Sequence, residues 1–389
     1  MEDCEHPADV APVALGRDAK GGEMHFASDW RVNNFDLIRL FAALQVAVGH
    51  ALSQFRPLPG SFLYHLGSAL SLLPGVPVFF VVSGLLISRS YEQSSSLHHY
   101  LRNRCLRIFP ALWVCLVVSV SVMLAIGVGV LGPVTTGAWL LWWAAQMSMF
   151  QSYSAPFLSS LHGLNPSLWT IPVELEFYLA LPALYWVARL RRRRGNVALL
   201  VLLGASLFTQ WTITYHASTH PASDWLVLTL FPYLWMFLVG ILIQRNWALL
   251  RAVLANRAHW WLLAYLLACV AGLVLHIRVT AGSVIINPVC LLILAGLIAS
   301  SAVSVPQLAG WILRGHDFSY GLYIYHVLAI ILLVHYGAPP GWLSLSATMS
   351  VSLAAAALSW LLIERPFLAR KRLALHPVAE PGKRIRGRA

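Results

Sequence analysis

The chain has 389 residues, of which 58% are hydrophobic and only 11% are charged, and its mean hydropathy is +0.69. An ordinary soluble domain is about a quarter charged, so the composition excludes that class and predicts an integral membrane protein. The formal net charge of +12 would suit a nucleic-acid-binding protein. The basic residues, however, recur between apolar runs and do not gather in one segment, which argues against a nucleic-acid partner.

Both ends of the chain are polar. Residues 1–33 contain no apolar signal-peptide core, so we expect a disordered cytosolic leader, with the first hydrophobic span acting as its own signal anchor. Residues 34–367 form the predicted transmembrane domain. Residues 368–389 are rich in Arg and Pro and are interpreted as a basic cytosolic tail.

Membrane spans are predicted from apolar runs, because about 20 such residues cross roughly 30 Å of hydrocarbon. A shorter apolar patch at 138–150 carries Trp139, Trp142 and Trp143, which indicates an interfacial or re-entrant helix and favours an interfacial role of these rings over stacking on a sugar. The ten predicted spans are 35–55, 74–91, 105–131, 168–190, 197–214, 224–243, 258–276, 283–301, 318–337 and 343–363.

The loop charges predict the orientation. With the N-terminus in the cytosol and ten spans, the outer loops hold only Arg56 and Arg278, and every other loop arginine faces the cytosol. This asymmetry follows the positive-inside rule. The sequence therefore predicts an all-α, polytopic membrane helical bundle of about ten transmembrane helices, with both termini cytosolic.

The first span carries two ionisable residues, Arg39 and His50, eleven positions apart. On a helix that spacing is three turns plus about 20°, so both side chains share one face, about 16 Å apart. A buried neutral imidazole is well suited to take a proton from a hydroxyl group. Alternatively, Arg39 reaches the lipid headgroups and His50 hydrogen-bonds a neighbouring helix. Asp36 lies one turn before Arg39 and is expected to pair with it.

Arg104 and Arg107 are three residues apart at the cytosolic end of the third span. They share a helix face, and two guanidinium groups in that position are able to hold a phosphate-bearing ligand by bidentate hydrogen bonds. The alternative is a positive-inside anchor without ligand. The spacing alone favours neither interpretation.

Two carboxylates, Glu174 and Glu176, lie within the fourth span. Since residues two apart on a helix do not share a face, we expect one to face a cavity and the other a neighbouring helix. Carboxylates in lipid must be paired or protonated. A structural pairing with an arginine elsewhere in the bundle is the alternative for each.

The ninth span opens with Asp317 and Ser319, either of which is a candidate N-cap. Tyr323 and His326 follow at a spacing of three, so they are expected to share a face. A single histidine on an apolar span is more often a packing group than a functional one. Near the end of the last span, Glu364 next to Arg365 is interpreted as boundary chemistry.

No metal site or disulfide framework is expected. The five cysteines form no CxxC pair, and four of them lie in or beside apolar stretches, where we expect small buried fillers: Cys105, Cys115, Cys269 and Cys290. The sequence contains no Walker, HExxH or GxSxG motif.

Taken in order, these motifs resemble the acyltransferase-3 family of integral membrane O-acyltransferases. Any one motif is weak, but five in order at plausible spacing are highly specific, and they cover about residues 33 to 367. The motifs are "NNFDLIRLFAALQVAVGH" (33–50), "PGVPVFFVVSGLLIS" (74–88), "YLRNRCLRIFPALW" (100–113), "PSLWTIPVELEFYLALP" (166–182), and "SYGLYIYH" (319–326) with "IERPF" (363–367).

The resemblance implies transfer of an acyl group, usually acetyl from acetyl-CoA, to a hydroxyl of a sugar or glycan. Acyl-CoA would be a co-substrate, with no bound cofactor. His50 matches the position regarded as catalytic in the family, Arg39 its partner, and Arg104 and Arg107 the pair linked to the donor. Many members also carry a C-terminal esterase-like domain, which this chain lacks, so a stand-alone enzyme is expected.

One departure from the family pattern concerns the fourth span. Many members read Val-Glu-Glu-Gln-Phe-Tyr, whereas this chain reads Val-Glu-Leu-Glu-Phe-Tyr. Glu174 keeps its place and is expected to orient His50 or an acceptor hydroxyl. Glu176 is one position along, so its role is in doubt, and it is grouped with Asp36, Tyr323 and His326 as residues that support the site.

The resulting hypothesis is a membrane O-acyltransferase with His50 as general base, in the cytoplasmic (inner) membrane of a bacterium. Its expected partners are membrane lipid, an acyl-CoA donor and a sugar, glycan or lipid-linked glycan acceptor. A transporter or exporter of a glycan or small molecule, without acyl-transfer chemistry, is the alternative. Against it, the sequence shows no inverted repeat and no paired Gly/Pro-broken helices.

Overall fold

The structure of the protein is a computed structural model, which describes residues 33–127, 135–148, 150, 165–187, 195–216, 226–281 and 284–373. Nearly all of the secondary structure in these ranges is helical. The exception is a short antiparallel ribbon of β1 (Thr280–Ala281) and β2 (Ile285–Ile286). The predicted leader, apart from Asn33, lies outside the described residues, as does the predicted basic tail beyond residue 373.

A helix overlaps each of the ten apolar ranges expected from the sequence. In chain order the helices are α2 (Phe35–Phe55), α3 (Phe62–Ser71), α4 (Gly75–Glu92), α5 (Leu97–Ala125), α6 (Thr136–Gln146), α7 (Thr170–Val187), α8 (Gly195–His216), α10 (Leu234–Arg245), α11 (Trp247–Leu254), α12 (Ala258–Val274), α13 (Pro288–Val303), α14 (Leu308–Leu313), α15 (Ser319–His335), α16 (Trp342–Ser359) and α17 (Arg365–Leu373).

Five helical segments of the described chain are long and apolar enough to cross a membrane. They are α2, the segment 62–92 (α3 together with α4), α5, residues 195–214 of α8, and the segment 342–370 (α16 together with α17). Helices α10 and α11 meet at 92° and give a sixth candidate if they count as one broken span, and α12, α13 and α15 are shorter apolar helices. The protein is therefore an integral membrane protein with a largely helical fold.

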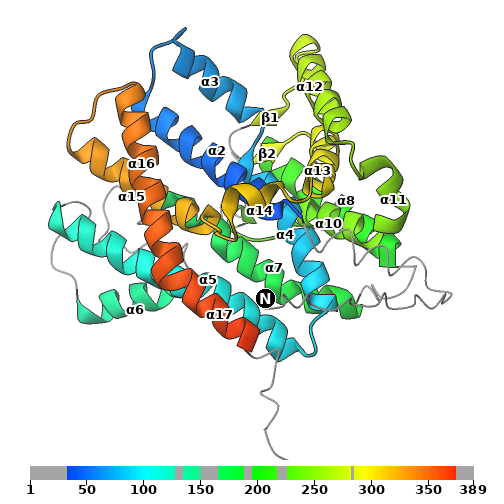
Figure 1. Cartoon of the computed structure of the whole chain (residues 1–389), viewed down its shortest axis with the longest axis horizontal. Coiled ribbons are helices and arrows are strands. Elements are labelled where there is room, and N and C mark those ends of the chain that lie inside the picture. The colour runs from blue at the N-terminus through cyan, green and yellow to red at the C-terminus, as the bar shows by residue number, and fades with distance from the viewer. Residues whose placement is uncertain are drawn as a thin grey trace, which may run out of the picture.

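Helix α2 lies at the centre of the bundle, with α4, α15 and α16 against it (Figure 1). Small buried residues let these neighbours approach closely, and they recur along the helix at Ala42, Ala43, Ala47 and Ala51. Its start is fixed by Asn34, whose side-chain amide donates to the backbone oxygen of Ser304 at 2.7 Å and accepts from the backbone N–H of Ala309 at 2.9 Å.

Gln45, the single polar residue between Arg39 and His50, holds the junction between α3 and α4. Its carbonyl oxygen accepts from the backbone N–H of Gly75 at 2.7 Å, and its amide donates to the oxygen of Leu70 at 3.0 Å. A Cβ on Gly75 would lie 2.4 Å from the backbone oxygen of Ala42. The first turn of α4 is thereby seated directly against the middle of α2.

Helices α4 and α10 cross at a pair of glycines. A Cβ on Gly84 would lie 2.0 Å from the backbone oxygen of Phe237, and a Cβ on Gly240 would lie 2.2 Å from the oxygen of Val81. Only glycine permits this backbone approach, so the crossing fixes how α4 sits on α10, which is buried over most of its length.

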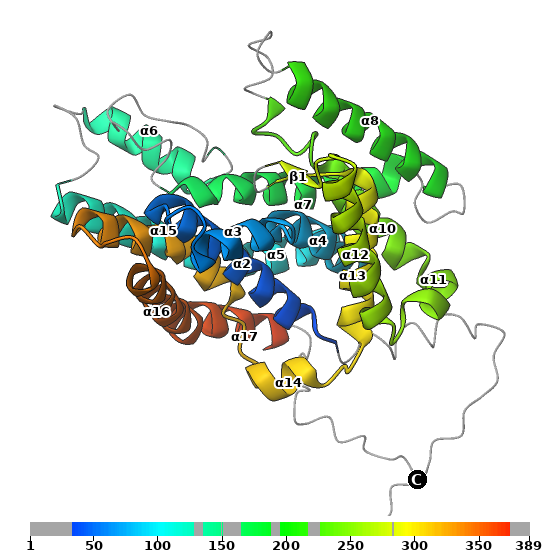
Figure 2. The same ribbon diagram turned by 90° about the horizontal axis from the view of Figure 1, so that it is seen from above.

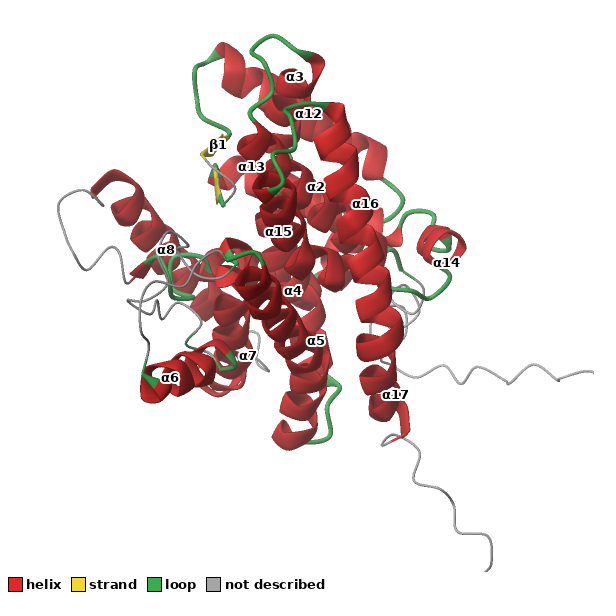
Figure 3. Ribbon diagram, turned by 90° about the vertical axis from the view of Figure 1, so that its left-hand side faces the viewer, coloured by secondary structure: helices red, strands yellow, loops and turns green. Residues whose placement is uncertain are grey.

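Helices α16 and α17 form one long rod along the side of the bundle (Figure 3), joined by a π-helical turn, η3, at Trp360–Glu364. In Figure 2, this rod and α14 lie on one side of the molecule, and α6 and α8 lie on the opposite side. A π turn inserts one extra residue and is often found at functional sites. Here it carries Glu364 into the interior, where this residue is 2% exposed.

Two smaller expectations are corrected. Cys115, Cys269 and Cys290 are buried as expected, but Cys105 is exposed because it faces outward from the first half of α5. The tryptophans of α6 do not all lie on a free surface, since Trp142 is fully buried and contacts the rings of Trp139 and Trp143 edge-on. The predicted cytosolic arginines at 189 and 191–194 lie outside the described residues.

Candidate active site

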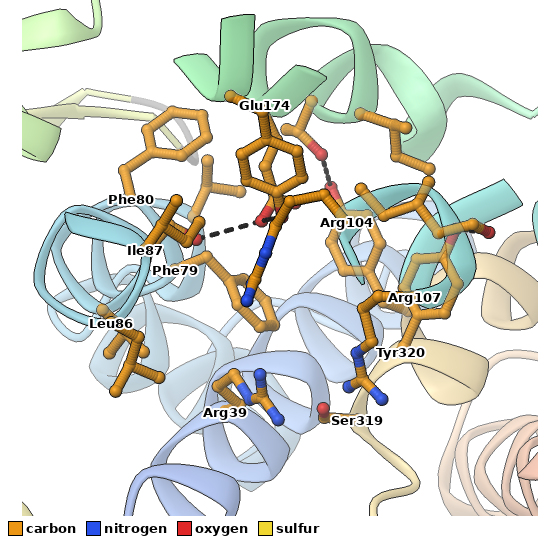
Figure 4. A pocket seen from close by; sticks show the side chains of 18 of the residues that line it. Arg39, Phe79, Phe80, Leu86, Ile87, Arg104, Arg107, Glu174, Ser319 and Tyr320 are labelled. Atoms are coloured by element: carbon orange, nitrogen blue, oxygen red, sulfur yellow. Dashed lines mark hydrogen bonds between the residues drawn. The ribbon is translucent and has the colours of Figure 1, made fainter. Parts of the chain in front are cut away.

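A cavity of about 340 Å³ opens between α2, α4, α5, α7 and α15 (Figure 4). Its wall carries the guanidinium groups of Arg39, Arg104 and Arg107 and the carboxylate of Glu174. The rest of the lining is mainly apolar and aromatic, including Phe79, Phe80, Ile108, Ile171, Tyr320 and Tyr323. The three arginines and Glu174, singled out separately in the sequence, thus meet in one place.

Asp317, in the loop before α15, binds two of the three arginines. Its Oδ2 accepts from Nη2 of Arg39 and from Nη2 of Arg107, each at 2.5 Å, and its Oδ1 accepts from the N–H and hydroxyl of Ser319. Burial alone raises the pKa of the Asp317 carboxyl, but the charges of Arg107 and Arg39 outweigh it and hold the pKa below its ordinary value. Asp36 also accepts from Arg39, at 2.7 Å, as its spacing predicts.

Removing the Asp317 carboxylate is expected to destabilise the fold. Asp317→Ala leaves the guanidiniums of Arg39 and Arg107 facing each other without their anion. We expect a loss of about 2–3 kcal/mol, less than for a fully buried pair because both arginines are partly exposed. The check is the midpoint of thermal aggregation in detergent. Asp36→Ala is the matched control, since its exposed pair with Arg39 should contribute under about 1 kcal/mol.

Arg104 differs from the other two arginines of the cavity. Its Nη2 donates to the hydroxyl of Ser90 at 2.8 Å, and its guanidinium lies 5.9 Å from the ring centre of Tyr178. Within the described part of the chain it forms no ion pair with a carboxylate, and its Nε is buried without a hydrogen-bond partner. It is therefore the cavity's most available cation for an anionic ligand.

Glu174 and Glu176 face different surroundings, as their spacing predicts. Glu174 lines the cavity and accepts from the hydroxyls of Ser83, at 3.1 Å, and Tyr178. Glu176 accepts from the backbone N–H of Leu230 at 2.7 Å and so ties α7 to the segment before α10. In the described structure Glu174 makes no hydrogen bond to His50. Its carboxylate lines the cavity instead.

The cavity extends along α4 from Ile87 to Val76, which is eleven residues and therefore about 16 Å. Tyr323 and Phe79 line it, and their rings meet edge-on with centres 5.5 Å apart. The Tyr323 hydroxyl donates to the oxygen of Ser167 at 2.9 Å, so it must accept from Thr170 at 2.7 Å. On α15 the lining includes Tyr323, whose ring centre lies 6.0 Å from that of His326, and on α2 it includes Arg39 but not His50.

Outside the cavity lining, His50 and His326 form a hydrogen-bonded pair. Nδ1 of His50 lies 2.9 Å from Nε2 of His326. His326 is fully buried, and its Nδ1 lies 2.7 Å from the backbone oxygen of Tyr323. The two histidines, 276 positions apart in sequence, are brought together because α2 packs against α15.

One residue near the arginines was missed by the sequence analysis. Glu364 was interpreted as boundary chemistry, but its side chain is buried, and its Oε2 lies 3.7 Å from Nη1 of Arg107. Its Oε1 accepts from the hydroxyl of Ser359 at 3.1 Å. The sequence signals only the end of a helix here, at Pro366, and "WLLIE" otherwise reads as an ordinary apolar helix ending in a charge, so the π turn was not expected.

Within the described residues no group of histidine, cysteine and carboxylate side chains is arranged to hold a metal ion. The site consists of a cavity with a basic part and an aromatic part, and of a histidine pair beside Tyr323. This arrangement suits a ligand that is anionic at one end and uncharged at the other.

The family model described as "Acyltransferase domain" matches residues 32–364. The chain belongs to the acyltransferase-3 family. It is thus an acyltransferase, and its helices make it a membrane acyltransferase. The matched range contains every candidate site residue and ends at Glu364, inside the π turn.

Two relatives are similar over nearly their whole length. "Nodulation protein 10" of Rhizobium leguminosarum bv. viciae is 35% identical over 352 residues, which cover 86% of this chain and 92% of that protein. "O-acetyl transferase" of Shigella phage Sf6 is 28% identical over 349 residues, which cover 87% of this chain and 96% of that protein. No solved structure is significantly similar to the chain.

Proposed function

We propose that the protein is a membrane O-acyltransferase that moves an acyl group, acetyl in the first instance, from acyl-CoA to a hydroxyl of a sugar or glycan. The observation that carries the proposal is the cavity itself, which is lined by three arginines and by Tyr323, whose ring lies next to the histidine pair of His326 and His50. The relative named O-acetyl transferase supports acetyl as the group moved.

The donor binds with its phosphates at the arginines. Arg104 is the first contact, because it has no carboxylate partner in the described chain, whereas Arg39 and Arg107 share Asp317. Guanidinium groups bind phosphate by charge-assisted hydrogen bonds. The uncharged arm of the donor lies along the apolar wall, and its thioester reaches Phe79 and Tyr323. Since acyl-CoA is made in the cytosol, this mouth faces the cytosol and the protein lies in the cytoplasmic membrane.

Chemistry takes place at His50. Its free ring nitrogen takes the proton of the acceptor hydroxyl while the oxygen attacks the thioester carbonyl carbon. A new C–O bond forms, the C–S bond breaks, and the leaving thiolate of CoA takes the proton back from His50. The products are an ester and free CoA, and the imidazole returns to its neutral state. In this scheme the thioester passes Tyr323, whose ring lies next to that of His326, to reach His50.

Arg104 provides a test of the donor site. Arg104→Ala is expected to raise the KM for acetyl-CoA about 10- to 100-fold with a small change in kcat, because a hydrogen bond to a charged group contributes about 1.5–3 kcal/mol. Steady-state kinetics of the purified protein measure it. Arg102→Ala is the matched control, since Arg102 lies on the same helix and does not line the cavity. Equal effects of both changes would contradict a specific donor contact.

The activity is tested with purified protein, radiolabelled acetyl-CoA and a panel of glycans. An O-acyltransferase releases one free CoA for each acetyl ester formed, whereas a transporter or exporter forms neither product. Donors with longer acyl chains, offered in competition, show whether acetyl is preferred. Label that appears in no acceptor, together with labelled substrate moved into vesicles, would overturn the proposal.

A further inference from the structure

We propose that His326 is a positioning residue that holds His50 in the neutral tautomer whose Nε2 carries no proton. The inference deepens the proposed function, because it rests on His50 as the base. His326 itself touches neither donor nor acceptor in this scheme. It acts through the ring of His50.

The proton positions follow from a backbone carbonyl. Nδ1 of His326 lies 2.7 Å from the oxygen of Tyr323 and 3.3 Å from the oxygen of Leu322. A carbonyl oxygen accepts hydrogen bonds and never donates one, so Nδ1 of His326 must carry a proton. In a neutral ring the other nitrogen, Nε2, then holds a lone pair.

His326 is neutral because of where it lies. Its side chain is 0% exposed, and the salt bridges of the described chain pair no carboxylate with it. A cation buried without an anion is strongly disfavoured. The lone pair on Nε2 therefore faces Nδ1 of His50 at 2.9 Å, so Nδ1 of His50 must donate its proton there.

The consequence falls on the other nitrogen of His50. A neutral imidazole has one proton, and in His50 that proton is on Nδ1, so Nε2 is left with the lone pair that a general base needs. No described residue hydrogen-bonds to this Nε2, and the His50 ring is only partly buried. The backbone oxygen of Tyr323 fixes the proton on Nδ1 of His326, and His326 in turn fixes the proton on Nδ1 of His50.

The hydrogen bond between His50 and His326 also stabilises the protonated, charged form of His50. When His50 takes a proton during the reaction, its Nδ1–H still donates to His326, now as a charge-assisted hydrogen bond. In other enzymes a carboxylate holds the base histidine in this way, and loss of the correct tautomer costs about 10⁴-fold in kcat. Here a neutral acceptor, His326, holds the base histidine, and it costs less free energy to bury in a membrane bundle than a carboxylate does.

Two variants of His326 separate positioning from packing. His326→Gln keeps an acceptor oxygen for Nδ1 of His50, whereas His326→Leu fills much of the space with no acceptor. We expect His326→Leu to lower kcat about 10²- to 10⁴-fold with an unchanged KM for acetyl-CoA, and His326→Gln to remain within about tenfold of the wild type. A role in packing alone predicts that the two variants lose kcat equally, and that result would overturn the proposal.

The tautomer is also measured directly, in the wild-type protein. ¹⁵N NMR of histidine-labelled protein in nanodiscs, with His50→Gln used to assign the signals, should show a protonated Nδ1 and an unprotonated Nε2 on His50. A protonated Nε2 would overturn the proposal even if His326→Leu fails to fold. If His50→Ala retains full activity while the tautomer is as expected, the proposed base fails and the positioning contact stands.

Discussion

Replacement of His50 by alanine is expected to lower acyl transfer at least about 10²- to 10⁴-fold, the usual contribution of a general base. The change removes the Nε2 of His50, to which no described residue hydrogen-bonds, and leaves the arginines of the cavity intact, of which Arg39 lies about 16 Å away along α2. The KM for acetyl-CoA should therefore change little. The measurement is ester formation and CoA release from labelled acetyl-CoA, at protein concentrations matched by size-exclusion chromatography.

The matched control is His335→Ala. His335 lies at the exposed end of α15, the helix that carries His326, and does not line the cavity. Its loss should leave the rate unchanged. If His50→Ala acylates as fast as the wild type, His50 is a packing residue and the proposed mechanism is wrong, whatever the state of the donor site.

The sequence was most informative about helices. Apolar length predicts them well, because a buried or lipid-facing helix needs a continuous apolar run, and a helix overlaps each of the ten ranges. The starting residues of α2 and α15 also agree closely, at Phe35 and Ser319. The breaks were not predictable. The 92° bend between α10 and α11 has no Pro or Gly at the break, and Pro366, just after the π turn at Trp360–Glu364, indicates the end of a helix but not a π turn.

The candidate site could be predicted only residue by residue. Helical spacing correctly placed Asp36 against Arg39, Glu174 and Glu176 on different faces, and Tyr323 beside His326. It could not pair Asp317 with Arg39 and Arg107, or His50 with His326, because those contacts join segments more than 200 positions apart. Long-range pairs depend on which helices are neighbours, and a single sequence contains no direct signal for that.

We expect an added methyl group to destabilise the fold most at the crossing of α4 and α10. In Gly84→Ala the new Cβ would lie 2.0 Å from the backbone oxygen of Phe237, which is not a flexible side chain that can move aside. Overpacking usually costs about 1–3 kcal/mol, and here the two helices must separate, so we expect a loss above about 3 kcal/mol and little monodisperse protein. Ser83 on the same helix would shift with α4 and disturb the cavity beside Glu174.

The control for this prediction is Gly204→Ala. Gly204 also lies within a helix, α8, but a Cβ there would meet nothing within 4 Å. Since alanine is favoured over glycine in a helix by about 1 kcal/mol, this variant should be as stable as the wild type or slightly more so. The two variants are compared by fluorescence-detected size-exclusion chromatography and thermal midpoint in the same detergent. A Gly84→Ala protein that melts like Gly204→Ala would mean that α4 and α10 lie farther apart than the glycine pair implies.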